Sequence, residues 1–436
     1  MTKVYGTDVF VNERRLLRFL KSEVEFRKGL KRGRKKLISS LDNDEGSEAD
    51  SDSEKNSHNT GIATVKMYVN ALVYFWTKQK YYTIPNPSEN PRGMLVKEYL
   101  KRLKFQNHQN KLNSFADRGE GTVDSHVRSS EFRILLRYFF LTPAQNLVRS
   151  GTIQVLNGLR TRADLLLSRA FSQRGQIQRV LQFADCTVEE LPNEGSSGAM
   201  ALKVRFFHSK TNPFERIQYS GCLRNKNVLE CAIGALAFYM FFRFQVSGSQ
   251  WPSFRSRESY YLCYLLCSGK DGTTPLTYNT QYGILKEAMN QLNIHSKVKT
   301  HIGRKLAPKE GIYSGAAKAE ASQHGGWQLN SLEASYLNDV LPLGMLRSLA
   351  GFTQSHTNYH ISREQIVPPP NLQLLVFPFL ENSFQEIESF MSLNSCSEFA
   401  GLGFLKLMMW LRIVFLQDSS ILINMVRILC LMVARV

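Results

Sequence analysis

The feature that most constrains the fold is the interval between apolar residues, which changes along the chain. In VKMYVNALVYFWTKQ, the residues Val65, Tyr68 and Leu72 recur at three- and four-residue intervals, the repeat of an amphipathic helix. Similar patterns occupy MLVKEYLKRLKF and SSEFRILLRYFFL. By contrast, ALKVRFFHS and ERIQYSG alternate around a turn at 210–213, which predicts a β-hairpin. The chain is therefore expected to be mainly α with a small β-hairpin or sheet.

A change of composition near the N-terminus predicts the domain organisation. Residues 28–36 read KGLKRGRKK, and residues 39–59 form a Ser/Asp/Glu tract with few aromatic or β-branched residues. Such a tract cannot bury enough apolar surface to fold, so we expect a disordered linker. Two functional interpretations of the basic run are a nuclear import signal and an arm that contacts phosphates. The alternative is a solvated, charged helix face. The expected divisions are a basic segment and linker at 1–60, a helical domain at 61–145, a second domain at 146–425 and a tail, cut short by truncation, at 426–436.

The net charge lies mainly outside this N-terminal part. Residues 1–56 carry 13 Lys+Arg against 11 Asp+Glu, so +16 of the net charge of +18 belongs to residues 57–436. A basic folded region favours a polyanionic partner, with nucleic acid first and an anionic membrane surface second. Its 7 cysteines are scattered and odd in number, which is not the pattern of a disulfide framework.

The stretch from Phe404 to Val436 is the one candidate for a membrane span. Charged residues interrupt it at Lys406, Arg412, Asp418 and Arg427. Because charges near the centre of a span are costly, a buried helix pair is the better interpretation. No stable membrane insertion is expected.

The second half of the chain contains residue types that could act on a phosphodiester. They are Arg174, Lys210 at the turn of the predicted hairpin, His301, Arg304, Trp327 and Tyr336. No carboxylate cluster with metal-ligand spacing accompanies them, so neither a metal nor another cofactor is expected. This set fits metal-free phosphoryl transfer to a protein nucleophile.

Each residue type suits one part of that reaction. Arginine forks donate to the non-bridging oxygens of the phosphate and do not deprotonate. A lysine can protonate the leaving 5′ oxygen, and a histidine can accept the proton of the nucleophile. A tyrosine with such help can attack phosphorus and form a covalent phosphotyrosine.

Other interpretations of these residues stay open. Arg160 and Arg162 offer rival positions for the first arginine, and His324 could take the place of Trp327. Arg174 and Arg304 could be solvated surface residues, and Lys210 could be an ordinary turn residue. His301 could be a structural histidine and Tyr336 a core tyrosine.

Spacing and sequence blocks carry a resemblance to a known family. Trp327 lies 23 residues after Arg304 and nine before Tyr336, spacings similar to those of tyrosine recombinases. The blocks LKVRFFHSKTNP, THIGRKLAPKEG and REQIVPPPNLQLLVFPFLE look like the fungal domain shared by the DNA-binding subunit of the point-centromere complex and by crypton transposases. Every catalytic role has a candidate here, so the sequence resembles the crypton members more closely.

The resemblance implies a tyrosine-recombinase-like, two-domain clamp on double-stranded DNA. It implies a nuclear protein that self-associates on DNA and either cleaves and rejoins strands through a 3′-phosphotyrosine or binds a centromere or promoter without catalysis. Tyr336 would be the nucleophile, Arg174 and Arg304 would hold the phosphate, Lys210 would be the general acid, His301 would assist proton transfer and Trp327 would donate to a phosphate oxygen. The expected DNA contacts are Arg92, Lys97, Lys101, Arg102, Lys104, Arg179 and Lys305.

Overall fold

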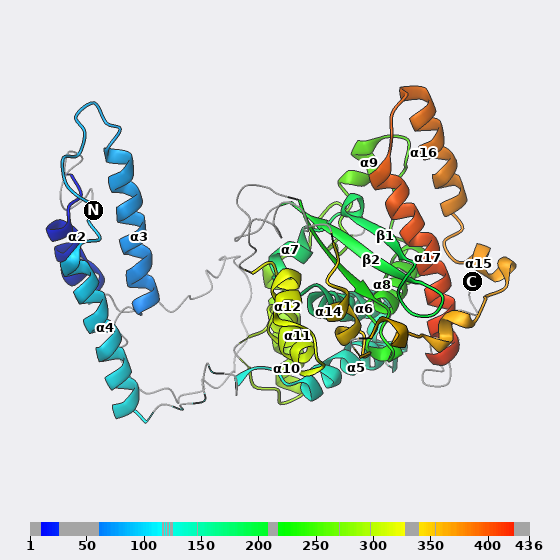
Figure 1. Cartoon of the computed structure of the whole chain (residues 1–436), viewed down its shortest axis with the longest axis horizontal. Coiled ribbons are helices and arrows are strands. Elements are labelled where there is room, and N and C mark those ends of the chain that lie inside the picture. Colours follow the sequence, from blue (N-terminus) through cyan, green and yellow to red (C-terminus); the bar gives the residue numbers. More distant parts are fainter. Residues whose placement is uncertain are drawn as a thin grey trace, which may run out of the picture. The chain divides into compact units, whose positions relative to one another are not determined.

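The computed structural model describes most of the chain and divides it into two compact units, Met1–Glu120 and Gly121–Val436. Figure 1 draws the helices and strands of both units, and each unit has its own hydrophobic core. The described residues, which exclude the side chains of 143–150, are 10–25, 61–115, 117, 119, 122, 125–145, 147–207, 217–269, 271–296, 298–327, 340–353 and 355–422.

The first unit is helical. It contains α2 (Glu13–Phe19), its continuation η1 (Leu20–Val24), α3 (Ile62–Gln79) and α4 (Met94–Asn113). Asn12 caps α2 by accepting the N–H of Arg15 at 3.0 Å, and Glu13 accepts the N–H of Val96 at 3.0 Å in the first turn of α4. The buried side chains of this core are Leu16, Phe19, Leu20, Val24, Val65, Val69, Val96, Tyr99 and Leu100.

The second unit places helices around a small sheet. The strands are β1 (Cys186–Leu191), β2 (Ala199–Phe206) and β3 (Gln218–Leu223), and the short helix η3 (Phe183–Asp185) precedes β1. The helices are α5 (Ser129–Gln145), α6 (Leu147–Phe171), α7 (Gly175–Arg179), α8 (Ala232–Phe241), α9 (Arg257–Tyr261), α10 (Tyr278–Gln291), α11 (Ile302–Tyr313), α12 (Lys318–Gly325), α14 (Leu343–Leu349), α15 (Pro370–Leu375), α16 (Leu380–Asn394) and α17 (Phe399–Leu422).

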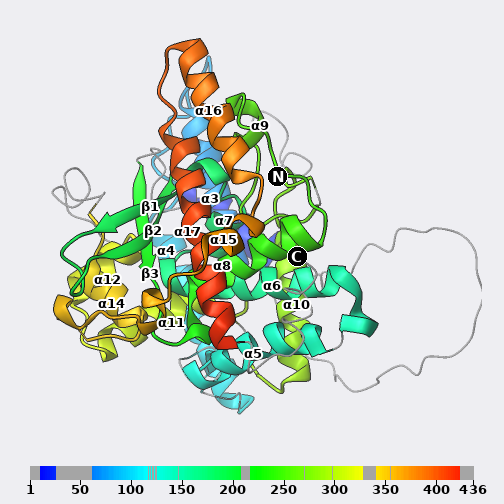
Figure 2. The same ribbon diagram turned by 90° about the vertical axis from the view of Figure 1, so that its right-hand side faces the viewer.

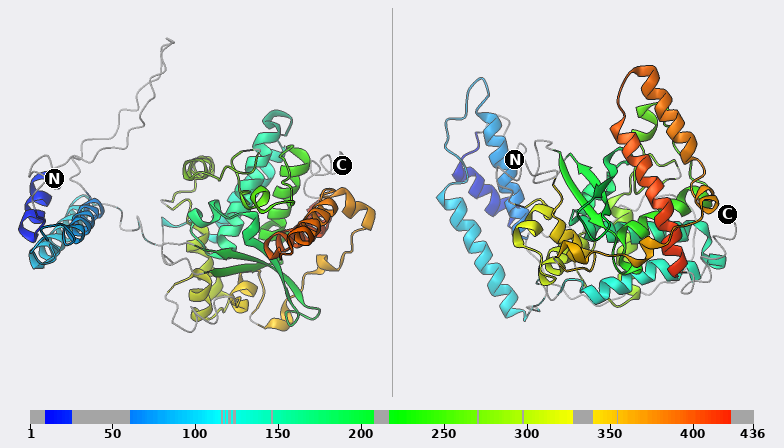
Figure 3. Two further views of the ribbon diagram at one scale, coloured as in Figure 1. Left: turned by 90° about the horizontal axis from the view of Figure 1, so that it is seen from above. Right: turned by 45° about the vertical axis from the view of Figure 1, so that its right-hand side comes forward.

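The sheet is antiparallel in the order β1-β2-β3. Its β2 and β3 strands are the predicted hairpin, with Leu202 opposite Cys222 and Val204 opposite Ser220. The expectation of a mainly helical chain with a small sheet is therefore confirmed, and β1 is an addition to it. Helices α11, α12 and α14 gather on one side of the unit, as both views of Figure 3 show.

Helix α6 is the centre of this unit. It packs against α5, α8 and α11, and every residue of α8 is buried. Apolar side chains of α6 such as Leu166 and Phe171 join the main core. Helix α11, which carries two predicted site residues, is thus held against a buried scaffold.

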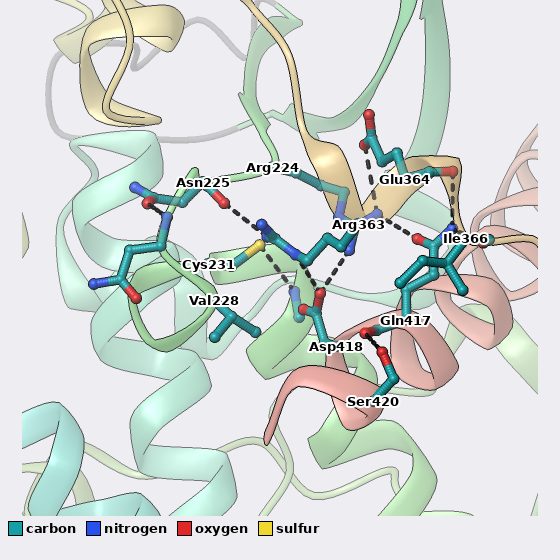
Figure 4. Close-up of polar contacts among 12 residues, drawn as sticks. Arg224, Asn225, Val228, Cys231, Arg363, Glu364, Ile366, Gln417, Asp418 and Ser420 are labelled. Atoms are coloured by element: carbon teal, nitrogen blue, oxygen red, sulfur yellow. Dashed lines mark hydrogen bonds and ion pairs between the residues drawn. The ribbon is translucent and has the colours of Figure 1, made fainter. Parts of the chain in front are cut away.

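Helix α17 has the length and hydropathy of a membrane span, yet 56% of its most apolar window is buried inside the fold. It runs beside α16 as a helical pair (Figure 2). Its Asp418 is fully buried and pairs with Arg224 and Arg363, each at 2.6 Å (Figure 4). Removing one partner of such a buried pair typically costs about 3–5 kcal/mol. The predicted stretch 404–436 is described only to residue 422.

The observed units differ from the expected domains at two places. Residues 13–24, expected in the basic segment ahead of the helical domain, form α2 and η1 and belong to the first unit, because Leu16, Leu20 and Val24 pack into its core. Helix α5, expected in the first domain, lies in the second unit, because its Phe132 and Leu135 join the core around α6. The linker at 39–59 and the tail at 426–436 lie outside the described residues.

Candidate functional site

Arg174 lies immediately before α7 as its N-cap residue, with an extended backbone (φ −75°, ψ 144°). The next residue, Gly175, lies in close contact with neighbouring elements. A Cβ at this position would be 2.9 Å from the Thr300 carbonyl oxygen and 3.1 Å from Gln281 Oε1. Only glycine fits this contact without a shift of backbone, so Gly175 keeps α7, and with it Arg174, beside the residue that precedes His301.

His301 and Arg304 come from the first turn of α11. His301 is the N-cap residue, and Arg304 follows three positions later, so their side chains lie on one side of the helix. Between them, Gly303 faces α6, where a Cβ would overlap the backbone of Ser168 and Arg169. The glycine therefore allows α11 to pack closely on α6 and fixes the start of the helix.

Arg304 is almost buried, at 9% exposure. Its Nη1 donates to the carbonyl oxygens of Ser172 at 2.7 Å and Gly325 at 3.2 Å, and its guanidinium carbon lies 4.4 Å from the ring centre of Trp327. Among the described residues, Nη2 has no hydrogen-bond partner. Burial and the nearby Arg174 lower the pKa of Arg304 to about 10, so the side chain stays cationic at neutral pH.

His301 lies among positive charges. Its pKa is lowered first by burial and then by Arg174, Arg304, Arg179 and Lys305. Its Nδ1 is 3.0 Å from the Thr300 hydroxyl oxygen. A histidine held neutral in this way can accept a proton near neutral pH.

Arg179 is anchored by a hydrogen-bonded chain of two buried residues, Gln281 and Asp164, that the sequence did not single out. Its Nη1 donates to Gln281 Oε1 at 2.6 Å, and Gln281 Nε2 donates to Asp164 Oδ2 at 2.6 Å. Asp164 is 2% exposed, and burial raises its pKa to about 6. An acidic residue within the apolar run of α6 was the available signal, because a buried carboxylate needs polar partners. Lys305 is exposed on α11.

The rival residues have other contacts. Arg160 donates to the Cys267 carbonyl oxygen at 2.8 Å, and Arg162 donates to that of Leu229 at 2.9 Å. Neither is among the charges that lower the pKa of His301. His324 is buried, and burial lowers its pKa to about 4, which keeps its ring neutral.

The structure thus gathers Arg174, Arg179, His301, Arg304 and Trp327 at one place in the second unit, with Lys305 close by. Lys210 and Tyr336 lie outside the described residues. Among the residues described, no group of three or more His, Cys, Asp or Glu side chains could hold a metal ion.

The predicted basic residues of the first unit are exposed. Lys97, Lys101 and Lys104 follow one another at helical intervals along α4, and His108 and Lys111 extend the same face. We call these five residues the α4 basic stripe. The other predicted cations have local contacts: Arg92 donates to Asn70 Oδ1 at 3.0 Å, and the Arg102 guanidinium carbon lies 5.6 Å from the ring centre of Tyr99.

Comparison with solved structures gives distant matches. One is a mutant of Flpe in complex with a DNA Holliday junction, at 12% identity and a TM-score of 0.37, covering 83% of this chain and 79% of the other. Another is the Flpe–Holliday junction complex, at 12% identity and a TM-score of 0.34, covering 82% and 78%. A search of curated proteins finds no match.

A family model matches residues 85–426, which include the whole of the gathered site. Its description is "Centromere DNA-binding protein complex CBF3 subunit, domain 2". The match covers most of the chain and confirms the resemblance to the centromere-subunit domain stated from the sequence blocks. This chain therefore belongs to the family of the centromere DNA-binding protein complex CBF3 subunit, domain 2.

Proposed function

We propose that this chain binds double-stranded DNA and that Arg174 and Arg304 hold a backbone phosphate. The observation that carries the proposal is the gathering of Arg174, His301 and Arg304 with no carboxylate paired to any of them among the described residues. Elsewhere in the second unit, some buried arginines have acidic partners, as Arg224 has Asp418, and others donate to backbone carbonyl oxygens, as Arg160 and Arg162 do. A phosphate would supply the missing negative charge and accept from the free Nη2 of Arg304.

The family description and the charge distribution support the same conclusion. The family is described as centromere DNA-binding, and +16 of the net charge lies outside residues 1–56. Cations on both units can contact phosphates, which gives affinity without reading sequence. We further propose that the protein is nuclear and self-associates on its DNA.

The test is the salt dependence of binding. Fluorescence anisotropy of the full chain with a labelled mixed-sequence duplex is expected to show affinity that falls steeply with salt. Arg174→Gln should weaken binding and make the plot of log affinity against log salt shallower by about 1, the loss of one phosphate contact. Lys406→Gln, an exposed lysine of α17, is the matched control. Equal slopes for Arg174→Gln and Lys406→Gln would reject the phosphate site.

Strand cleavage is a second candidate function, favoured by the neutral state of His301 beside two arginines. Tyr336 Oη would form a bond to phosphorus as the bond to the 5′ oxygen breaks. His301 would take the phenol proton, Lys210 would give a proton to the leaving oxygen, and Trp327 would donate to a non-bridging oxygen. The 3′-phosphotyrosine would return the strand by the reverse steps, without a cofactor. Such an activity would place the chain with crypton-derived recombinases.

The discriminating experiment uses a nicked suicide duplex, which traps a covalent protein–DNA adduct. An adduct that forms with the natural chain and is lost in Tyr336→Phe supports cleavage. Absence of the adduct, with duplex binding retained, supports the non-catalytic alternative, a binder of centromere or promoter DNA. Fractionation of a tagged protein checks the nuclear location, and light scattering of the DNA complex checks self-association.

A further inference from the structure

Beside the gathered site, two stacked tyrosines lie between two cations. The guanidinium carbon of Arg179 lies 5.4 Å from the ring centre of Tyr278, and the rings of Tyr278 and Tyr282 lie 5.8 Å apart, inclined by 24°. Lys299 Nζ lies 5.9 Å from the ring centre of Tyr282. We call these four residues the cation–tyrosine row. None of the three residues after Arg179 had been assigned a role.

Helix α10 fixes the geometry of the row. Tyr278 and Tyr282 are one helical turn apart and lie on one side of α10, next to the buried Gln281 and Leu285. Thr277 caps the helix by accepting the N–H of Thr280 at 3.1 Å. The Tyr278 side chain is 50% exposed although its helix is well anchored. The Tyr278 ring is therefore presented to solvent on an anchored helix, with the half-buried Tyr282 beside it.

The row and its neighbour Lys286 lack acidic partners. Among the described residues, Arg179, Lys286 and Lys299 form no ion pair with a carboxylate, whereas some exposed arginines elsewhere in the unit do. Examples are Arg133 with Glu230 at 2.9 Å and Arg255 with Glu386 at 3.1 Å. Lys299 donates to the Ser296 carbonyl oxygen at 2.6 Å, and burial together with the charge of Lys286 lowers its pKa. A polyanion against this face would relieve the repulsion between the two lysines.

The row is continuous with the gathered site. Arg179 belongs to both, because its charge also lowers the pKa of His301. Arg179 also donates to Gln281, which in turn donates to the buried Asp164. This hydrogen-bonded chain anchors the guanidinium group, which also lies near the Tyr278 ring. A strand whose phosphate lies at Arg174 and Arg304 would meet the row next.

We propose that the cation–tyrosine row is a second DNA-backbone contact, in which Arg179 and Lys299, assisted by Lys286, bind phosphates beside the one held at the gathered site. The tyrosine rings hold the two cations in place through cation–π contacts, so that less conformational freedom is lost on binding. The inference rests on the proposed function, DNA binding, and adds a specific surface to it.

The experiment measures the salt dependence of duplex binding by the full chain, with the mixed-sequence duplex as probe. Lys299→Gln is expected to make the slope shallower by about 1, and the double variant Lys286→Gln/Lys299→Gln by about 2. Tyr278→Leu and Tyr282→Leu keep every charge and should weaken binding roughly 2- to 5-fold for each ring removed. Tyr278→Phe keeps the ring and should bind like the natural chain. Thermal melts verify that each variant is folded.

The outcomes separate the inference from the proposed function. If the natural chain fails to bind the duplex, the proposed function itself fails. If the natural chain binds with a steep salt slope but Lys286→Gln/Lys299→Gln keeps the slope of the Lys406→Gln control, the row is not a backbone contact. Tyrosine-to-leucine variants that bind as tightly as Tyr278→Phe would reject the role of the rings.

Discussion

His301 is surrounded by positive charge, and its surroundings decide its protonation state. Burial is the largest influence on its pKa, and Arg174 is the next. Because both oppose the imidazolium, less of the ring is protonated than in a free histidine at the same pH. A bound phosphate would act in the opposite direction, since a negative charge favours the protonated ring.

We expect NMR titration of the His301 ring protons to give a pKa below the ordinary value of 6.5. In Arg174→Gln the pKa should rise toward 6.5, because one neighbouring positive charge is gone. In Lys406→Gln it should not move. A His301 pKa that is equal in the natural chain and in Arg174→Gln would contradict the proximity of the two side chains.

Asp164 provides a second test at the residue scale. Its pKa is raised from 3.8 to about 6 by burial, so between these values the folded chain binds more protons than the unfolded chain. The contribution of Asp164 to stability therefore decreases as the pH rises through this range and is constant above about 6. A shift of this size corresponds to on the order of 3 kcal/mol.

Asp164→Asn should remove this pH dependence. The free energy of unfolding of the variant minus that of the natural chain is expected to increase as the pH is raised from 3.8 to 6, in urea titrations followed by circular dichroism. Glu388→Gln, which removes an exposed carboxylate on α16, is the control for loss of charge. A difference that stays flat or falls with pH would show that Asp164 is ionised throughout the range.

At the scale of elements, the position of α11 depends on its contact with α6. A side chain at Gly303 would overlap the backbone of Ser168 and Arg169, and backbone cannot rotate away as a side chain can. Gly283, in the middle of α10, offers the opposite case, because a Cβ there would meet nothing within 4 Å. Both glycines are helical, so the comparison isolates the packing contact.

Gly303→Ala is expected to lower the free energy of unfolding by about 1–3 kcal/mol, the usual cost of overpacking. It should also weaken DNA binding, because His301 and Arg304 move with the helix. Gly283→Ala should raise stability by up to about 1 kcal/mol, since alanine is the better helix former. Equal melting temperatures for the two variants would show that α11 and α6 are not in close contact.

Periodicity predicted the long helices and the β2–β3 hairpin, because those segments bury one regular face. It did not predict β1, whose sequence CTVEEL has two adjacent glutamates and gains its order from pairing with β2. Four of the residues chosen by motif spacing, Arg174, His301, Arg304 and Trp327, lie near one another, and their roles stay predictions. The same method missed Gln281 and Asp164, because their contacts join distant parts of the sequence. Gln281 is 102 positions from Arg179, and Asp164 is 117 positions from Gln281.

At the scale of the whole molecule, both units present basic residues to solvent. The α4 basic stripe belongs to a core of its own in the first unit, and the cation–tyrosine row belongs to the second. Two weak contacts on one chain reinforce each other, because binding of the first raises the effective concentration of the second. The affinity of the full chain should therefore depend on both units.

Replacing Lys97, Lys101 and Lys104 together with glutamine tests this dependence. If each lysine contacts a phosphate, the salt slope of duplex binding should become shallower by about 3, and the affinity should fall at every sequence tested. The same three positions changed to arginine keep the charge and should keep the slope. When these substitutions are combined with Lys286→Gln/Lys299→Gln, the slope changes of the two sets should add, because the two sets belong to separate units of the protein. A glutamine variant with an unchanged slope would show that these three lysines do not contact the DNA.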